Sequence, residues 1–148
     1  RGETLEVSVD DEKVQTVTCH ELTHAFTIHL RLPAWLNEGL ATLAMDHYLG
    51  RGVVRREPLT RLSDGRAPAG AMALKVSKPQ RLILLYVRGY WLARYIEQTK
   101  PALLKELLSR RHARGEIEDR LAAAYGKDRQ RFWQEMDREL QAWFGRML

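Results

Sequence analysis

The residues of this chain best suited to metal binding and catalysis are two histidines four residues apart, with a glutamate directly after the first. They are His20, Glu21 and His24, in the segment 19-CHELTHAF-26. On a helix, residues i and i+4 lie about 40° apart around the axis, so His20 and His24 can bind one metal ion. Imidazole ligands favour zinc. Glu21 lies about 100° round from His20, where it can reach a water molecule on the metal.

A third ligand is expected, because a catalytic zinc ion usually has three protein ligands and one position for water. The candidate is Glu38, in the segment 33-PAWLNEGLATL-43. Its neighbours on a helix are mostly apolar, and an ionised carboxylate among them is costly unless a cation compensates it. The break at 31–33 lets a second helix turn back, so we expect Glu38 to face the two histidines. The alternative is a salt bridge from Glu38 to an arginine.

These two segments resemble the gluzincin metallopeptidases, the clan of thermolysin and the zinc aminopeptidases. HELTH followed by WLNEGLA is similar to the two motifs of that clan, with a shorter gap that looks closer to compact bacterial gluzincin domains. The resemblance is strong over residues 14–44 and weak in the C-terminal helices. It implies Zn²⁺ bound by His20, His24 and Glu38, with Glu21 as the general base.

A tyrosine is the candidate for a further catalytic group. The segment 86-YVRGYWLARYI-96 resembles the Tyr-x-[Lys/Arg]-Gly stretch of the aminopeptidase branch. The resemblance implies that the hydroxyl of Tyr86 donates a hydrogen bond to the oxyanion of the tetrahedral intermediate, a role that suits a neutral phenol. Tyr90, one turn later, and His112 are the alternative donors. We expect His112, which lies among arginines, to face solvent.

Four other residues are expected to lie outside this machinery or at its margin. We expect His29 and His47 to be ordinary surface or hydrogen-bonded histidines. Asp46 could orient a zinc-bound histidine, and Cys19 is expected to be a small buried side chain.

The length and composition favour one globular domain. The chain has 148 residues, a net charge of +5 and one cysteine, so an internal disulfide is excluded. No apolar run is long enough to span a bilayer. Because the chain begins at Arg1, we expect a single domain, residues 1–148, that is a fragment of a longer chain.

The elements that must position these residues are predicted to be mainly helical. The alternation in 4-TLEVSV-9 predicts a short strand, and residues 50–78 read as a loop-rich segment with one short helix near Leu59. The predicted helices are 11–30, 34–49, 80–99, 101–112, 116–125 and 128–144. We expect the second of them to be central, since it is apolar over much of its surface. The fold class is therefore mainly α, of the α+β kind: a zincin-like helical core with a short N-terminal β element.

The favoured function is zinc-dependent hydrolysis of peptide bonds in a peptide or protein substrate, with Glu21 as general base. One alternative is a non-catalytic zinc domain that binds a protein partner, against which stand Glu21 and the open ligand position. Another is a helical module that binds nucleic acid through the arginines of 51–56 and 110–114. We expect no nucleic acid, because acidic residues are spread throughout and no known motif accompanies these arginines.

The resemblance also implies a substrate platform. Gluzincins hold the substrate backbone against an edge strand that precedes the HExxH helix, and only about ten residues precede that helix here. We expect the rest of the platform to lie upstream in a longer protein or on a partner. No exopeptidase motif of the aminopeptidases is present, so cleavage within a chain or from its end stays open.

Overall fold

The fold is built from helices. The computed structural model describes residues 11–54 and 79–145, with the side chains of 79–84 left out. In chain order the elements are α1 (Asp11–Thr27), a 3₁₀ turn (Ile28–Leu30), α2 (Ala34–Leu49), α4 (Pro79–Thr99), α5 (Pro101–Leu107), α6 (Glu116–Tyr125) and α7 (Phe132–Gly145). The described ranges hold no strand, so the predicted mainly-α fold is confirmed. The expected strand 4–9 and the short helix near Leu59 lie outside them.

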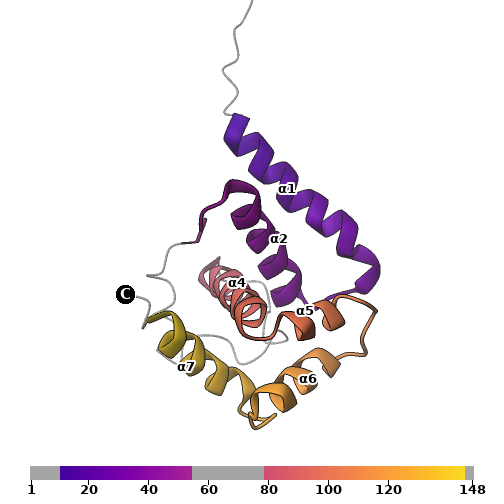
Figure 1. Ribbon diagram of the computed structural model, residues 1–148, viewed down its shortest axis with the longest axis vertical. Helices are drawn as coiled ribbons and strands as arrows, with labels where there is room; N and C mark the ends of the chain where they lie inside the picture. The colour runs from indigo at the N-terminus through magenta and orange to yellow at the C-terminus, as the bar shows by residue number, and fades with distance from the viewer. Residues whose placement is uncertain (1–10, 55–78, 146–148) are drawn as a thin grey trace, which may run out of the picture.

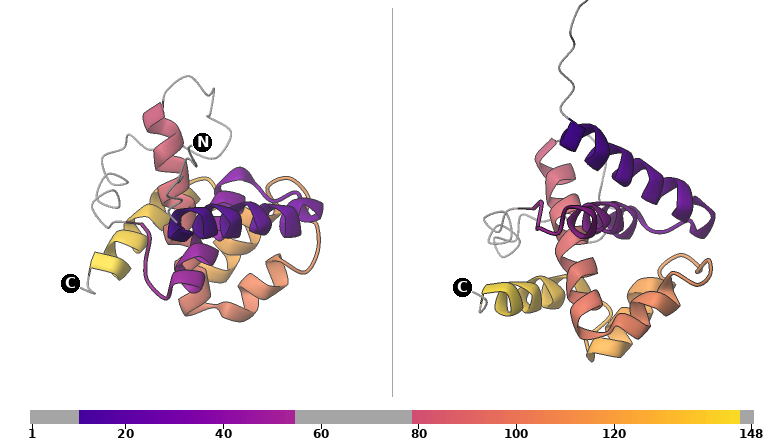
Figure 2. Two further views of the ribbon diagram at one scale, coloured as in Figure 1. Left: turned by 90° about the horizontal axis from the view of Figure 1, so that it is seen from above. Right: turned by 45° about the horizontal axis from the view of Figure 1, so that its top comes forward.

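Helix α2 occupies the centre, between α1 and α4 (Figure 1). The right view of Figure 2 shows α1 and α2 beside the first half of α4, and α5, α6 and α7 gathered around its other end. The largest fully buried side chains come mainly from α2, α4 and α7: Trp35, Leu36, Tyr90, Trp91, Leu92, Ile96, Phe132, Met136, Leu140 and Phe144. The predicted central place of the second helix is therefore confirmed. None of the described helices is long and apolar enough to cross a membrane.

The backbones of α2 and α4 touch where two glycines meet. A Cβ atom added to Gly39 would lie 2.3 Å from the carbonyl oxygen of Gly89, and one added to Gly89 would lie 2.0 Å from the carbonyl oxygen of Trp35. Both distances are far shorter than any real Cβ contact. Only glycine at each position allows the two helices to approach this closely.

Helix α1 is held differently, because it buries little apolar surface against the described residues. Thr16 is its one buried residue there. Five apolar side chains of α1 and of the turn after it are half or more exposed: Val14 (50%), Val17 (53%), Leu22 (50%), Phe26 (75%) and Ile28 (75%). Polar contacts cross to α2 instead, including a 2.6 Å hydrogen bond from the Tyr48 hydroxyl to Gln15 Oε1.

A tight turn joins α1 to α2. Arg31 adopts the left-handed conformation, with φ of 49°, and its N–H donates to the carbonyl oxygen of Ile28 over 3.3 Å. Leu30 is buried and anchors the turn. Pro33, with φ of −60° and ψ of 147°, then leads into α2, where its carbonyl oxygen accepts the N–H groups of Leu36 and Asn37 at 3.0 Å. The chain therefore reverses within a few residues.

Two predicted boundaries are wrong in the C-terminal part. Helix α5 ends at Leu107 instead of His112, and the chain then forms a connection that runs to Gly115. Helix α7 begins at Phe132 instead of at Asp128. The side chain of Asp128 accepts the N–H groups of Gln130 (2.8 Å) and Arg131 (3.0 Å), so it caps the turn that leads into α7 and is not itself part of the helix.

Replacing Gly89 with alanine tests the contact between α2 and α4. The added methyl group has no space, so we expect the free energy of unfolding to fall by at least about 2 kcal/mol, as overpacked cores do. Gly145→Ala is the matched control, because no atom lies within 4 Å of an added Cβ at that helical glycine. Thermal unfolding of the two variants measures the difference. Equal melting temperatures would show that the two backbones are not in contact.

Candidate metal centre

Three potential ligand atoms converge between α1 and α2. Glu38 Oε2 lies 3.4 Å from Nε2 of His20 and 3.5 Å from Nε2 of His24, and the two Nε2 atoms are 3.0 Å apart. The two histidines come from adjacent turns of α1, and Glu38 comes from the second turn of α2. The three form the one group of possible metal ligands in residues 11–54 and 79–145.

These separations fit one small metal ion. Zinc binds imidazole nitrogen and carboxylate oxygen at about 2.0–2.2 Å, so neighbouring ligand atoms of a tetrahedral site lie roughly 3.3–3.5 Å apart. The two distances to Glu38 fall in that range, and the distance between the histidines is slightly shorter. Two imidazoles with one carboxylate are also a donor set that zinc accepts readily. The residues present therefore can hold a metal ion.

The centre lies near the surface. The side chains of both histidines are 23% exposed and that of Glu38 is 21% exposed, so a small ion and a water molecule can reach it. The Nδ1 atom of His24 is buried, and no described residue gives it a hydrogen bond. A metal-bound histidine usually donates from its second nitrogen to an outer partner, and within the described ranges His24 has none.

Glu21 is exposed on the same helix. It follows His20 directly, so its side chain projects from α1 to one side of the three ligands. No described residue forms an ion pair or a hydrogen bond with it. Its carboxylate is therefore exposed to solvent, without a described partner.

Tyr86 lies close enough to Glu38 for the negative charge of Glu38 to raise its pKa. The pKa of Tyr86 is raised, first by burial and then by the negative charge of Glu38. Tyr86 is partly buried on α4, one turn before Gly89. The close approach of α2 and α4 at this glycine therefore brings a neutral phenol toward the group of ligands.

Tyr90, the alternative phenol, is bound elsewhere. It is fully buried, its hydroxyl donates to Asp46 Oδ2 over 2.5 Å, and Arg94 donates to that hydroxyl over 2.7 Å. Burial is the largest cause that raises its pKa to about 12, followed by the hydrogen bond to Asp46. With its hydroxyl engaged in this way, Tyr90 joins α4 to the end of α2.

Asp46 does not lie against a histidine of the centre. Besides the Tyr90 hydroxyl, it accepts the N–H of Val53 over 2.7 Å and lies 3.7 Å from Arg94. These contacts fasten the segment after α2 to α4. The idea that Asp46 orients a metal-bound histidine is therefore corrected.

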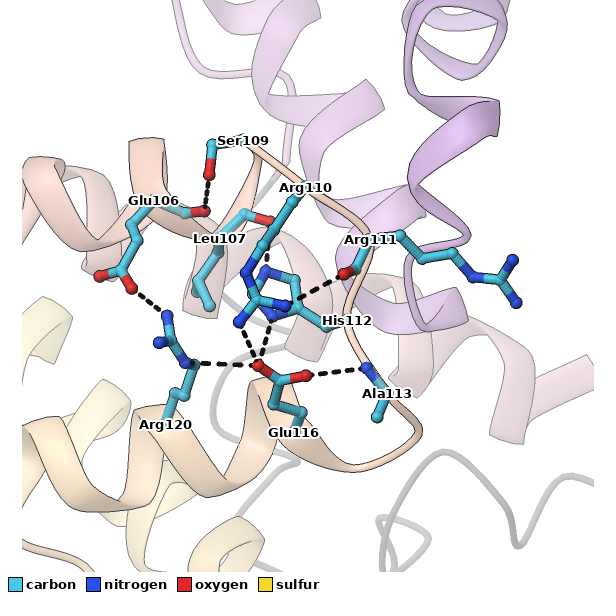
Figure 3. Close-up of polar contacts among 9 residues, drawn as sticks. All are labelled: Glu106, Leu107, Ser109, Arg110, Arg111, His112, Ala113, Glu116 and Arg120. Carbon is cyan, nitrogen blue, oxygen red and sulfur yellow. Dashed lines mark hydrogen bonds and ion pairs between the residues drawn. The ribbon is translucent and has the colours of Figure 1, made fainter.

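The side chain of His112 is buried, which corrects the expectation that it faces solvent. Its side chain is 1% exposed, with Nδ1 3.0 Å from Glu116 Oε1 and Nε2 3.1 Å from the carbonyl oxygen of Leu107 (Figure 3). Arg110 is the largest cause that lowers the pKa of Glu116 to about 2, with Ala113 N–H and His112 adding to it. His112 thus ties the connection between α5 and α6 together and is no part of the metal centre.

The remaining candidates also lie apart from the centre. His47 pairs with Glu97 over 2.7 Å on the surface, and His29 is exposed. Cys19 is a free cysteine of intermediate exposure, so it is less buried than expected. No pattern in the sequence predicted one contact beside the centre, in which Thr27 Oγ1 of α1 lies 3.3 Å from Asn37 Oδ1 of α2.

Metal content tests the centre directly. We expect purified protein to bind one Zn²⁺ per chain, and His24→Ala and Glu38→Ala to weaken binding more than the roughly 10–100-fold that loss of an outer partner costs. His47→Ala is the control, because His47 also contacts a glutamate but lies outside the group. Calorimetric titration of Zn²⁺ into metal-free protein gives the affinities. If all three variants bind as the parent does, these residues are not ligands.

Comparisons of this chain with protein families, with curated proteins and with solved structures find no match. The residues of the centre and their geometry are therefore the basis for inferring a function. His20, His24 and Glu38 can hold a metal ion, and Glu21, which follows His20 in the chain, is exposed.

Proposed function

We propose that this domain hydrolyses peptide bonds with a zinc ion held by His20, His24 and Glu38. The convergence of these three side chains, with Glu21 directly after the first histidine, is the observation that carries the proposal. A purely structural zinc site usually has four protein ligands, whereas three leave room for a reacting molecule. The similarity of the two motifs to those of gluzincin peptidases adds to this argument.

The proposed roles follow from the chemistry of each group. A zinc ion at the centre would supply Lewis acidity, which favours loss of a proton from water near neutral pH. The Glu21 carboxylate accepts that proton as the water oxygen attacks the carbonyl carbon of the peptide bond. Glu21 then passes the proton to the leaving nitrogen as the carbon–nitrogen bond breaks. One water molecule is consumed, both of its protons end on the products, and a carboxylate and an ammonium group are released.

Tyr86 is the proposed donor to the developing oxyanion. Its raised pKa keeps the phenol neutral, so it has a hydrogen to donate. The influence of Glu38 on that pKa supports a position beside the ligands, and no described residue holds its hydroxyl. A donor aimed at developing charge stabilises the transition state more than the substrate.

Glu21→Gln tests the general base. The amide keeps the shape of the side chain but cannot accept the proton, so we expect peptide hydrolysis to fall by about 100–10,000-fold with Zn²⁺ affinity unchanged. Asp11→Asn, a change of another exposed carboxylate of the same helix, is the control. Hydrolysis of a mixed peptide library, followed by mass spectrometry, gives the rates. Unchanged cleavage by Glu21→Gln would exclude this role.

Phenylalanine at each tyrosine separates the two candidate donors. We expect Tyr86→Phe to lower kcat by about 100-fold, the usual loss for one oxyanion donor, with little change in melting temperature. Tyr90→Phe should instead lower the melting temperature, because it removes the partner of Asp46 and Arg94. Turnover and thermal unfolding of both variants are the measurements. The reverse pattern would exchange their roles.

A second candidate function is a non-catalytic zinc domain that binds a protein partner. The exposed apolar side chains of α1 favour it, since a group of this kind on one helix often marks a binding surface. The proposals differ in their dependence on Glu21. A zinc-loaded domain that cleaves no peptide, and whose partner binding is unaffected by Glu21→Gln, would favour the second.

A further inference from the structure

Polar contacts at its two ends hold α1 against α2, and the metal ligands lie between them. Near the start of α1, the Tyr48 hydroxyl donates to Gln15 Oε1 over 2.6 Å. At the end of α1, Thr27 Oγ1 lies 3.3 Å from Asn37 Oδ1. Because α1 buries so little apolar surface against the described residues, such contacts have an unusually large share in setting its position.

The contact at the end of α1 lies directly beside the ligands. Thr27 follows His24 by three residues, which is less than one turn of helix, and Asn37 immediately precedes Glu38. A change in the distance between Thr27 and Asn37 therefore changes the distance between the ligands of α1 and the ligand of α2. The contact at the other end of α1 is farther from His24 and from Glu38, because Gln15 precedes His24 by nine residues and Tyr48 follows Glu38 by ten.

The hydrogen bonding of Thr27 indicates which atom of Asn37 takes part. The Thr27 hydroxyl has one hydrogen, and its 2.8 Å contact with the carbonyl oxygen of Thr23 uses it. The oxygen that remains is an acceptor, so a stable contact needs a donor from Asn37. Since the oxygen and nitrogen of an asparagine amide are assigned from such contacts, the arrangement that satisfies both residues has Asn37 Nδ2 donating to Thr27 Oγ1.

We propose that Thr27 and Asn37 are positioning residues of the metal centre. Their hydrogen bond holds His20 and His24 opposite Glu38, so that the ligand atoms already have their short separations before a metal ion binds. The inference rests on the metal centre of the proposed function and adds the device that assembles it. Neither residue touches the metal or the substrate.

Thr27→Val is the main test, with Thr18→Val as its matched control. Valine has nearly the shape of threonine, and both positions lie on α1. Each replacement removes a hydrogen bond from the threonine hydroxyl to the backbone carbonyl oxygen four residues earlier. Thr18 is exposed and its hydroxyl bonds only within its own helix, so the two variants differ in the contact with Asn37. Thr27→Ser keeps the hydroxyl, and Asn37→Ala removes the contact from α2 without changing Thr27.

Two readouts decide the outcome. In titrations with Co²⁺, we expect Thr27→Val and Asn37→Ala to bind about tenfold more weakly than the parent, with altered visible absorption, while Thr27→Ser and Thr18→Val bind as the parent does. The double variant should lose no more than either single one, because both remove the same contact. In the metal-free protein, the imidazole nuclear magnetic resonances of His20 and His24 should shift in Thr27→Val and stay in place in Thr18→Val.

The two readouts keep this inference separate from the proposed function. Equal Co²⁺ affinities and equal imidazole spectra for Thr27→Val and Thr18→Val would overturn the positioning role. A parent protein that binds no Co²⁺ would overturn the proposed function, and the metal-free spectra would still decide whether Thr27 holds the histidines. Normal metal binding without peptide cleavage would count against the proposed reaction and leave the positioning role standing.

Discussion

Direct contact between the backbones of α2 and α4, at Gly39 and Gly89, is the constraint on which the other features depend. It brings the largest buried side chains of the two helices into one core, with Trp35 on one side and Trp91 on the other. It also determines the site, since Glu38 precedes one glycine and Tyr86 lies one turn before the other. A feature of the core thereby controls how far a phenol stands from a candidate metal ligand.

Helix α1 depends on a different kind of interaction. It carries two of the three ligands and the candidate base, yet its contacts with α2 are largely polar within the described ranges. Hydrogen bonds are directional and short, so they can fix a position even where little apolar surface is buried. The centre therefore lies between α2, which packs closely on α4, and a helix that is held by a few specific contacts.

The sequence predicted the elements that depend on local signals. Helix α2 and helix α6 have the predicted bounds, because Pro33 precedes α2 and left-handed glycines follow both, at Gly50 and Gly126. The spacing of the two histidines and the short break before α2 also predicted that Glu38 would face them, and the structure places it there. The roles of these residues in catalysis stay predictions.

Features that depend on distant contacts could not be predicted in this way. The place of Tyr90 depends on Asp46, which is 44 residues away in the chain. The burial of the His112 side chain depends on how the connection between α5 and α6 folds over Leu107 and Glu116. The neighbouring arginines instead predicted that His112 would face solvent. The apolar pattern of α1 also did not predict that Val17 and Phe26 are exposed in the described structure. Periodicity identifies the apolar face of a helix, but it does not identify the residues that pack against that face.

The sparse burial of α1 has a consequence for the energetics of local opening. A helix with few buried apolar contacts can detach at a lower free energy than a core formed by α2 and α4, and its amide hydrogens then exchange first. Ligands on both sides of that interface make a bound ion a bridge across it. Ion binding therefore raises the cost of detaching α1 by an amount that grows with the logarithm of the free ion concentration. The fraction of molecules in which α1 is attached therefore depends on the concentration of free metal ion.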